Sequence, residues 1–175
     1  MIEVFTKNTF KEMPWKNGGG STLELYKIPH EDSFNFRLSI ATVSSDGPFS
    51  HFPGIERILL LLEGAGFRLN KKPHPVTMDT AFFPITFAGE EDIHCQLIQG
   101  TCRDFNVMTR RDFATSFLTI TEMDGKNPLK IKALCPLKFI YDTHAQTLTK
   151  LDQGDESEFG GSFPTRLLII DVNLV

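Results

Sequence analysis

The chain has 175 residues, of which 41% are hydrophobic, and its 18 basic and 22 acidic residues give a net charge of −4. This composition is ordinary for a water-soluble globular protein, and the length allows one sizeable core or two small fused domains. The densest basic groups are pairs, such as Lys71-Lys72 and Arg110-Arg111. A nucleic-acid-binding surface needs clustered basic residues, so we expect no nucleic-acid partner.

Targeting and redox signals are also missing from the sequence. The first residues contain no basic segment followed by an apolar run, and no apolar run is long enough to span a bilayer. The three cysteines (Cys95, Cys102 and Cys135) lack C-x-x-C spacing, which argues against a zinc site and a disulfide framework. We therefore expect a cytoplasmic protein with no membrane partner.

Strand patterns and turn residues alternate about every ten residues, which predicts an all-β sandwich or barrel. Thr9–Trp15 is expected to hold one helical turn at most. Three glycines argue against regular structure from Lys16 to Ser21. Ile58–Leu62 is a run of five aliphatic residues between turn signals, and predicts a strand buried on both faces around which the others are laid. The strands predicted in this part of the chain are residues 2–5, 22–28, 34–43, 58–62, 67–69, 76–78, 81–87, 93–98 and 105–109.

The strand pattern starts again near residue 113 with less definition. A weak helical period covers Arg110–Phe117, and Asp152–Glu158 has the composition of an acidic turn. The predicted strands here are residues 117–120, 129–131, 137–141, 147–151 and 166–170. We predict two strand-rich halves packed together, residues 1–112 and a smaller half of residues 113–175.

Five motifs follow one another in the first part of the chain: Pro14–Gly20 with Thr22 and Glu24, Phe36–Ala41, Gly47–Arg57, Leu61–Gly64 and Asp104–Arg110. Together they resemble the motifs of the HutD/Ves family. The resemblance covers about the first 111 residues, and the second half matches only loosely around Asp152–Gly154. It implies a bicupin, in which one chain forms two double-stranded β-helix barrels. It also implies a link to histidine utilization or to stress response, as a regulator or modulator.

Many cupins bind a metal, but the ligand positions of the cupin pattern carry other residues in this chain. Anchored on Gly64 and on Pro84, the pattern places its four ligands at Ser50, Phe52, Arg57 and Gly89. A guanidinium group only donates hydrogen bonds and repels a divalent cation. We therefore expect neither a metal nor another cofactor.

Arg57 and Arg37 suggest a different use for the first barrel. Each lies beside apolar strand residues, and an arginine inside a barrel needs an acceptor for its planar set of donors. A small carboxylate would serve, with neutral groups adding hydrogen bonds. The alternative is an internal ion pair with Glu24, Glu56, Glu63 or Asp104, and for Arg37 this alternative or a solvent-facing position is favoured. The candidate ligand-binding residues are Trp15, Asn17, Arg37, Ser39, Ser50, Phe52, Arg57, Asp104 and Asn106.

The other candidate residues carry weaker signals. If Ser50 and Phe52 point inward, strand alternation turns His51 outward. The remaining histidines (His30, His74, His94 and His144) share no metal-like spacing. The tri-glycine loop lacks the G-K-[ST] ending of a P-loop, so a strained turn or a lid is expected, with Trp15 either closing a pocket or lying in the core. Asp104, Asn106 and Met108 alternate along one strand and should share a face.

Three functions remain open from the sequence. The first is a non-enzymatic binder of a small carboxylate metabolite. The second is a metal-independent cupin enzyme, an isomerase or hydrolase, with an acid–base pair from Asp104, Glu56 or His51; the nucleophile signals at Ser50, Cys95 and Cys102 are poor. The third is an interaction module that self-associates, for example as a homodimer.

Overall fold

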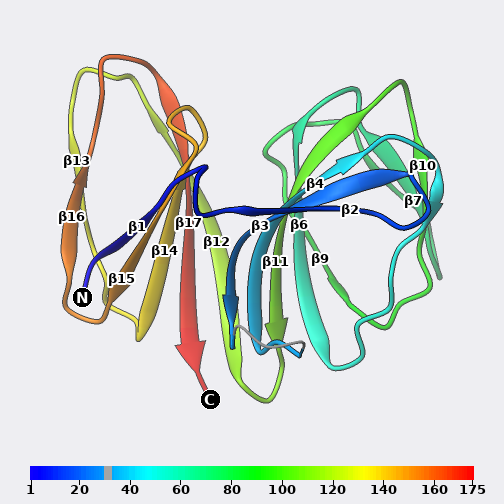
Figure 1. Cartoon of the computed structure of the whole chain (residues 1–175), viewed down its shortest axis with the longest axis horizontal. Coiled ribbons are helices and arrows are strands. Elements are labelled where there is room, and N and C mark those ends of the chain that lie inside the picture. The colour runs from blue at the N-terminus through cyan, green and yellow to red at the C-terminus, as the bar shows by residue number, and fades with distance from the viewer. Residues whose placement is uncertain (30–32) are drawn as a thin grey trace. The chain divides into compact units, whose positions relative to one another are not determined.

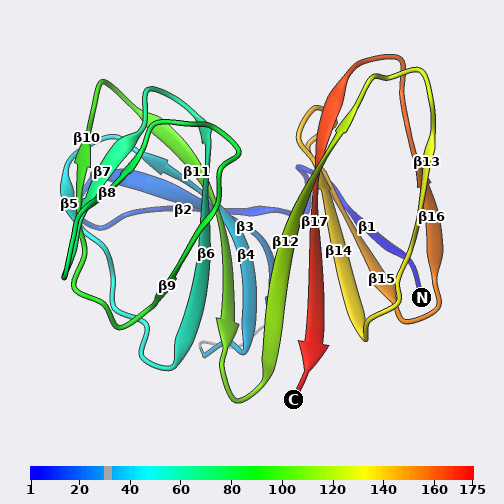
Figure 2. The ribbon, with the colours of Figure 1, turned by 180° about the vertical axis from the view of Figure 1, so that it is seen from behind.

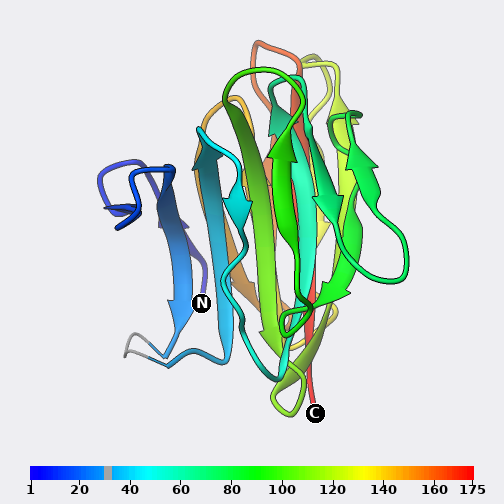
Figure 3. The same ribbon diagram turned by 90° about the vertical axis from the view of Figure 1, so that its right-hand side faces the viewer.

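The structure is a computed structural model, and it describes residues 1–29 and 33–175. His30, for which a solvated or structural role is expected, lies outside the described residues. Across the described residues the chain forms strands β1 to β17 and no helix, as Figure 1, Figure 2 and Figure 3 show. The all-β prediction is confirmed. The same described part contains no helix long and apolar enough to cross a membrane.

The chain divides into two compact units. The larger unit is Lys11–Phe113, and the smaller unit combines Met1–Phe10 with Ala114–Val175. The division at residues 113 and 114 lies close to the predicted boundary. The first ten residues differ from the expectation, because β1 (Glu3–Phe5) pairs with β15 (Thr147–Asp152) of the smaller unit. Sequence patterns within β1 contain no information about so distant a partner.

The larger unit consists of two antiparallel sheets. The six-stranded sheet has the order β2 (Lys11–Pro14), β3 (Gly20–Ile28), β4 (Phe36–Val43), β11 (Cys102–Arg110), β6 (Ile55–Glu63) and β9 (Ile85–Ala88). The four-stranded sheet has the order β5 (Gly47–Pro48), β10 (His94–Leu97), β7 (Phe67–Asn70) and β8 (Val76–Met78). Figure 2 shows β4, β11 and β6 side by side. One hydrophobic cluster contains buried side chains from both sheets, among them Leu59 and Leu61 from β6 and Phe67 and Leu69 from β7. The two sheets therefore face each other.

The predicted central strand is buried as expected but is not at the centre. Ile58 through Leu61 in β6 are all buried, which agrees with an apolar run between turns. In the sheet, however, β6 lies between β11 and the edge strand β9, and the middle positions belong to β4 and β11. β11 has a mixed sequence, with buried polar and apolar residues in alternation, so hydrophobicity alone did not identify it as central.

Two predicted helical segments are wrong, and two predicted irregular segments are right only in part. β2 occupies the segment expected to hold a helical turn, and β12 (Ala114–Met123) occupies the second half of the weak helical period. Gly20 and Ser21 already belong to β3, because Gly20 lets β3 approach a neighbouring backbone: a Cβ there would lie 2.1 Å from the Thr42 carbonyl oxygen. The acidic segment after Asp152 contains the start of β16 (Glu156–Phe159).

The smaller unit contains a five-stranded sheet and a two-stranded sheet. The five-stranded sheet has the order β1, β15, β14 (Leu137–Asp142), β17 (Thr165–Leu174) and β12, and the two-stranded sheet pairs β13 (Leu129–Lys132) with β16. Its core contains buried Met123, Ile131, Ile140, Leu151 and Leu167. These residues come from both sheets, so the unit has its own hydrophobic interior.

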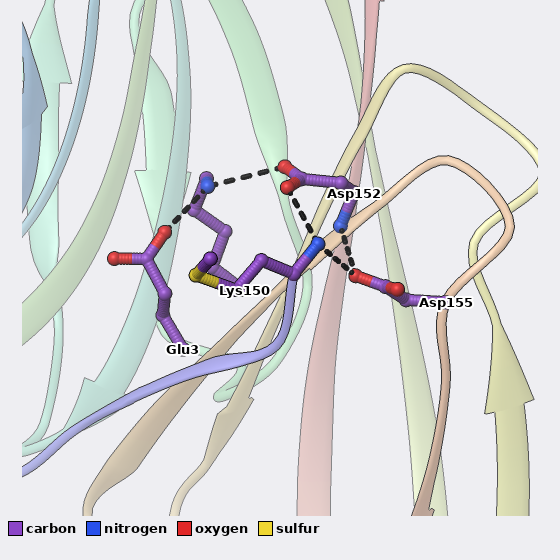
Figure 4. A network of polar contacts seen from close by, with 5 residues as sticks. Glu3, Lys150, Asp152 and Asp155 are labelled. Atoms are coloured by element: carbon purple, nitrogen blue, oxygen red, sulfur yellow. Dashed lines mark hydrogen bonds and ion pairs between the residues drawn. The ribbon is translucent and has the colours of Figure 1, made fainter.

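A polar network ties the first residues into the smaller unit (Figure 4). The amino group of Met1 lies 2.8 Å from Asp152 and 2.7 Å from Asp155. The Lys150 ammonium group lies 2.6 Å from the Glu3 carboxylate and 3.1 Å from Asp152. Lys150 is largely buried, whereas its partners are more exposed. Because ion pairs with exposed groups add little stability, the network mainly orients β1, and the backbone pairing with β15 holds the strand in place.

Gly66, between β6 and β7, is expected to be intolerant of a side chain. Its φ is +96°, and a Cβ would lie 2.0 Å from the Met78 carbonyl oxygen, so alanine requires the backbone to move. We expect Gly66→Ala to destabilise the larger unit by about 2–4 kcal/mol, measured by urea unfolding. Gly47→Ala is the matched control, because a Cβ there meets no atom within 4 Å. Equal stability of the two variants would contradict the assigned backbone geometry.

Candidate functional site

A cavity of about 530 Å³ opens in the larger unit and brings the sequence-predicted residues together. All nine candidates line it: Trp15, Asn17, Arg37, Ser39, Ser50, Phe52, Arg57, Asp104 and Asn106. His51 does not line it; its imidazole is about half exposed and lies 2.8 Å from the Asp92 carboxylate. The fold thus brings residues that lie far apart in the sequence together around one cavity.

Strand register explains why these residues share one wall. Directly opposite residues of an antiparallel pair lie on the same face, and so do alternate residues along a strand. In this sheet Met108 of β11 is opposite both Arg37 of β4 and Arg57 of β6. Asn106, two residues earlier, is opposite Ser39. The predicted shared face of Asp104, Asn106 and Met108 is confirmed, since all three line the cavity.

Arg57 is the buried cation of the site. It is only 7% exposed, and its guanidinium carbon lies 5.2, 5.7 and 5.0 Å from the ring centres of Phe49, Phe52 and Phe87. Aromatic faces attract a guanidinium group at these distances. The three rings also remove it from water, and this desolvation lowers the pKa of Arg57 to about 10, still well above neutral pH. Arg57 therefore carries a positive charge in an apolar, aromatic surrounding.

The hydrogen bonds of Arg57 leave it incompletely satisfied. Its Nη2 donates to Asn106 Oδ1 over 2.6 Å, and Asn106 Nδ2 donates to Asp104 Oδ1 over 2.5 Å. Its Nε is buried and has no hydrogen-bond partner in the described part of the chain. The predicted alternative of a direct ion pair with a carboxylate is not found there, because Asn106 stands between the guanidinium and Asp104. The group thus retains donor capacity next to the cavity.

Asp104 is a buried acid with an altered protonation equilibrium. It is 1% exposed, and desolvation raises the pKa of its carboxyl group to about 7, although the Arg57 charge and the Asn106 hydrogen bond act in the opposite direction. The raised pKa means that the cost of burying the ionised carboxylate outweighs its attraction to Arg57, from which Asn106 separates it. The carboxyl group consequently titrates near neutral pH.

Arg37 is engaged by a carboxylate of the neighbouring strand. Its Nε donates to Glu24 Oε2 over 2.9 Å, and its guanidinium carbon lies 5.9 Å from the Phe34 ring centre. The alternative of an internal ion pair, which the sequence favoured for Arg37, is thus present, although the side chain still lines the cavity. Because Glu24 offsets its charge, Arg57 is the more available cation.

The tri-glycine loop forms a tight turn between β2 and β3. The Trp15 amide donates to Gly20 over 2.9 Å, and the Asn17 side chain accepts from the Gly19 amide over 3.0 Å. Trp15 lines the cavity and also packs against the hydrophobic cluster, and its indole N–H donates to Thr22. The turn is a structural device that holds Trp15 at the cavity wall.

The residues at the cupin ligand positions do not fit a metal ion. Ser50, Phe52 and Arg57 line the cavity. The Gly89 carbonyl oxygen accepts a hydrogen bond from the backbone N–H of Phe52. A hydroxyl, a phenyl ring, a guanidinium group and a glycine offer no set of anionic or imidazole ligands. Across residues 1–29 and 33–175 no group of three or more histidine, cysteine or acidic side chains is arranged to hold a metal.

Of the acid–base and nucleophile candidates, Asp104 and Ser50 line the cavity. Glu56 contacts Arg111 and does not line the cavity, and His51 lies outside it, so Asp104 is the candidate acid or base that reaches the cavity. Burial raises the pKa of the Cys95 thiol to about 12, so it is not a thiolate at neutral pH. A metal-independent enzyme therefore stays a prediction.

Sequence reasoning missed several residues that shape the site. Phe49 and Phe87 complete the surroundings of Arg57, and Phe87 lies directly opposite Arg57 in the neighbouring strand. The predicted strand of residues 81–87 contains Phe87, but only the pairing of β9 with β6 places its ring on the guanidinium group. Phe49 lies in an irregular segment, where no period indicates direction.

Comparison with known proteins places the chain in a family. The HutD family model matches residues 7–159. An uncharacterized 21.2 kDa protein of the hutC 3′ region of Pseudomonas putida is 38% identical over 109 residues, which are 61% of this chain and 57% of that protein. Protein Ves of Cronobacter sakazakii is 39% identical over 114 residues, 58% of this chain and 59% of Ves. The aligned regions thus span a little over half the length of these curated relatives.

Solved structures share the fold over almost the whole chain. A conserved protein of unknown function from Pseudomonas aeruginosa superposes with a TM-score of 0.81 at 25% identity, covering 99% of both chains. HutD from Pseudomonas fluorescens superposes with a TM-score of 0.78 at 23% identity, covering 100% of both. E. coli YlbA shares the cupin-like fold at 8% identity and a TM-score of 0.68, over 98% of this chain and 90% of YlbA. This all-β, cupin-like chain belongs to the HutD family.

Proposed function

We propose that this chain is a metal-free binder of a small carboxylate metabolite, with Arg57 in the larger unit recognising the carboxylate. The observation that carries the proposal is a buried arginine on a cavity wall whose Nε has no hydrogen-bond partner in the described residues. Leaving a buried donor without an acceptor costs about 1–3 kcal/mol, and more for a charged group. A ligand oxygen that accepts from this Nε–H group relieves that cost.

The chemistry of the site favours a carboxylate over a neutral ligand. A guanidinium group binds a carboxylate through two parallel N–H···O bonds, which are shorter and stronger than bonds between neutral groups. Asn106 already accepts from one nitrogen of Arg57, so part of the donor set remains for a ligand. Ser39 and Ser50 both line the cavity and offer neutral hydroxyl groups.

The size and lining of the cavity favour a small, flat ligand. Its volume of about 530 Å³ lies within the range of small-molecule sites, roughly 300–1,000 Å³. Trp15, Phe49 and Phe52 provide aromatic surface beside the charged group. Aromatic walls around a cation suit an acid with a planar unsaturated or aromatic body.

The family supplies a biological context for this proposal. A curated relative from Pseudomonas putida bears the name of a hutC 3′ region, and a similar solved structure is a HutD obtained in a formate condition. We propose that the bound metabolite is an acid of histidine utilization and that binding modulates that process. A role in stress response is the alternative that the likeness to Ves suggests.

Calorimetric titration with carboxylates of increasing size tests the binding function. Formate, acetate, benzoate and urocanate are the ligands, and benzamide is the neutral control that matches benzoate in shape. Formate has three non-hydrogen atoms and should not bind more tightly than about 1 mM, whereas the larger acids should bind more tightly. Saturable binding of benzoate and urocanate without binding of benzamide supports the proposal. The absence of saturable binding for every acid, or equal binding of benzamide, contradicts it.

A further inference from the structure

The buried carboxyl group of Asp104 lies next to the proposed anion site. Asn106 bridges it to Arg57 through two hydrogen bonds, and all three side chains line the same cavity. Asp104 and Asn106 are both nearly inaccessible to solvent, at 1% and 4% exposure. An anion that docks on Arg57 therefore adds a second negative charge to a site that already holds one acid.

The charges around Asp104 do not compensate for a second anion. From β6 it faces Arg57, and from β4 the site holds Arg37, whose charge is offset by Glu24 of β3. From β10 it faces Cys95, a neutral thiol whose pKa the Asp104 charge itself helps to raise. Lys16 also lines the cavity but is exposed to solvent, so Arg57 is the buried cation that serves two acids, Asp104 and the ligand.

We propose that the site takes up a proton together with its anion, so that Asp104 becomes protonated when a carboxylate docks on Arg57. This inference rests on the proposed function and adds its regulation by pH. The proton comes from solvent and no covalent bond to carbon changes. The bound state then contains one cation, one anion and one neutral acid, a combination that a poorly solvated cavity tolerates better than two anions.

The titration of Asp104 in the free protein places this coupling near physiological pH. Its pKa is already raised to about 7 by burial, so the carboxyl group titrates near neutral pH. A carboxylate a few ångströms away repels the ionised form and raises the pKa further. By linkage, affinity for the anion must fall as pH rises through this range.

Formate and benzoate are suitable probes, because each stays ionised above pH 6 and has no second group that titrates up to pH 8. We expect the affinity of wild-type protein for both to fall about tenfold from pH 6 to pH 8. Calorimetry at pH 7.5 in triethanolamine and in Tris, neither of which is an anion, should show uptake of most of one proton per ligand, because the observed heat depends on buffer ionisation. Asp104→Asn mimics the protonated acid, so its affinity should be independent of pH and close to the wild-type value at pH 6. His51→Gln removes the histidine next to the cavity-lining residues Ser50 and Phe52 and should keep the wild-type pH dependence.

Each outcome decides the proposal. Proton uptake in wild type that is lost in Asp104→Asn and kept in His51→Gln supports it. Binding of formate and benzoate with no proton uptake, or with the same pH dependence in Asp104→Asn, overturns the coupling and leaves the binding function intact. Failure of both acids to bind at pH 6 overturns the coupling and the binding function together. The two-buffer measurement uses wild-type protein alone and does not depend on any variant.

Discussion

Replacing Arg57 by methionine is expected to weaken benzoate binding about 100-fold, which corresponds to about 3 kcal/mol. The variant keeps a side chain of similar length against Phe49, Phe52 and Phe87 but removes the charge and the donors. Loss of one partner from a buried, charge-assisted contact costs 2–5 kcal/mol or more in protein complexes. Calorimetric titration of the variant at pH 6 measures the effect.

Two further variants separate the charge of Arg57 from its shape. Arg57→Lys keeps the charge but not the planar donor set, so binding should fall about tenfold, between the wild type and the methionine variant. Arg103→Gln is the matched control, because Arg103 pairs with the exposed Glu63 and does not line the cavity. Wild-type affinity in Arg57→Met would mean that the carboxylate binds elsewhere.

Replacing Asp104 by asparagine is expected to change how stability depends on pH. The folded protein holds the proton of this carboxyl group to a pKa of about 7, whereas an unfolded aspartate releases it near pH 4. Between these values the folded state binds more protons, so rising pH destabilises the wild type through this group, and the effect levels off above about pH 7. Asp104→Asn lacks this contribution. The free energy of unfolding of the variant minus that of the wild type should therefore increase by on the order of 3 kcal/mol from pH 4 to pH 7.

Urea unfolding monitored by tryptophan fluorescence measures this difference in unfolding free energy for the larger unit. Trp15 is the single tryptophan of the chain and packs against the hydrophobic cluster of the larger unit. Asp46→Asn serves as a control for an aspartate that lies outside the cavity. A stability difference between wild type and Asp104→Asn that stays constant from pH 4 to pH 8 would contradict the raised pKa of the buried acid.

Local pattern predicted most of the strands but not their partners. The alternation in β4 and the aliphatic run of β6 are encoded within each segment, so their strand character and burial could be read directly. The central position of β11 and the pairing of β1 with β15 depend on residues far away in the chain. β2 and β12 form strands because they pair with β3 and β17, and this pairing overrides a weak local preference for helix or turn.

The candidate site was predictable as a set of residues but not as a set of contacts. Departure from the cupin ligand pattern pointed to Ser50, Phe52 and Arg57, and strand alternation supplied Asp104 and Asn106. The role of Asn106 as a bridge could not be predicted, because it depends on the register that sets β11 between β4 and β6. For the same reason the pairing of Arg37 with Glu24 was one alternative among several until β3 and β4 were aligned.

A crystal structure of the chain grown with 4-bromobenzoate at pH 6 tests the central claim most directly. Bromine scatters anomalously, so the ligand can be located without ambiguity. The account predicts one ligand in the cavity of the larger unit, with its carboxylate oxygens within hydrogen-bond distance of the Arg57 guanidinium group and its ring against the aromatic wall. A metal ion bound at Ser50, Phe52 and Arg57, or an Arg57 side chain turned into bulk solvent with the cavity empty of ligand, would contradict it.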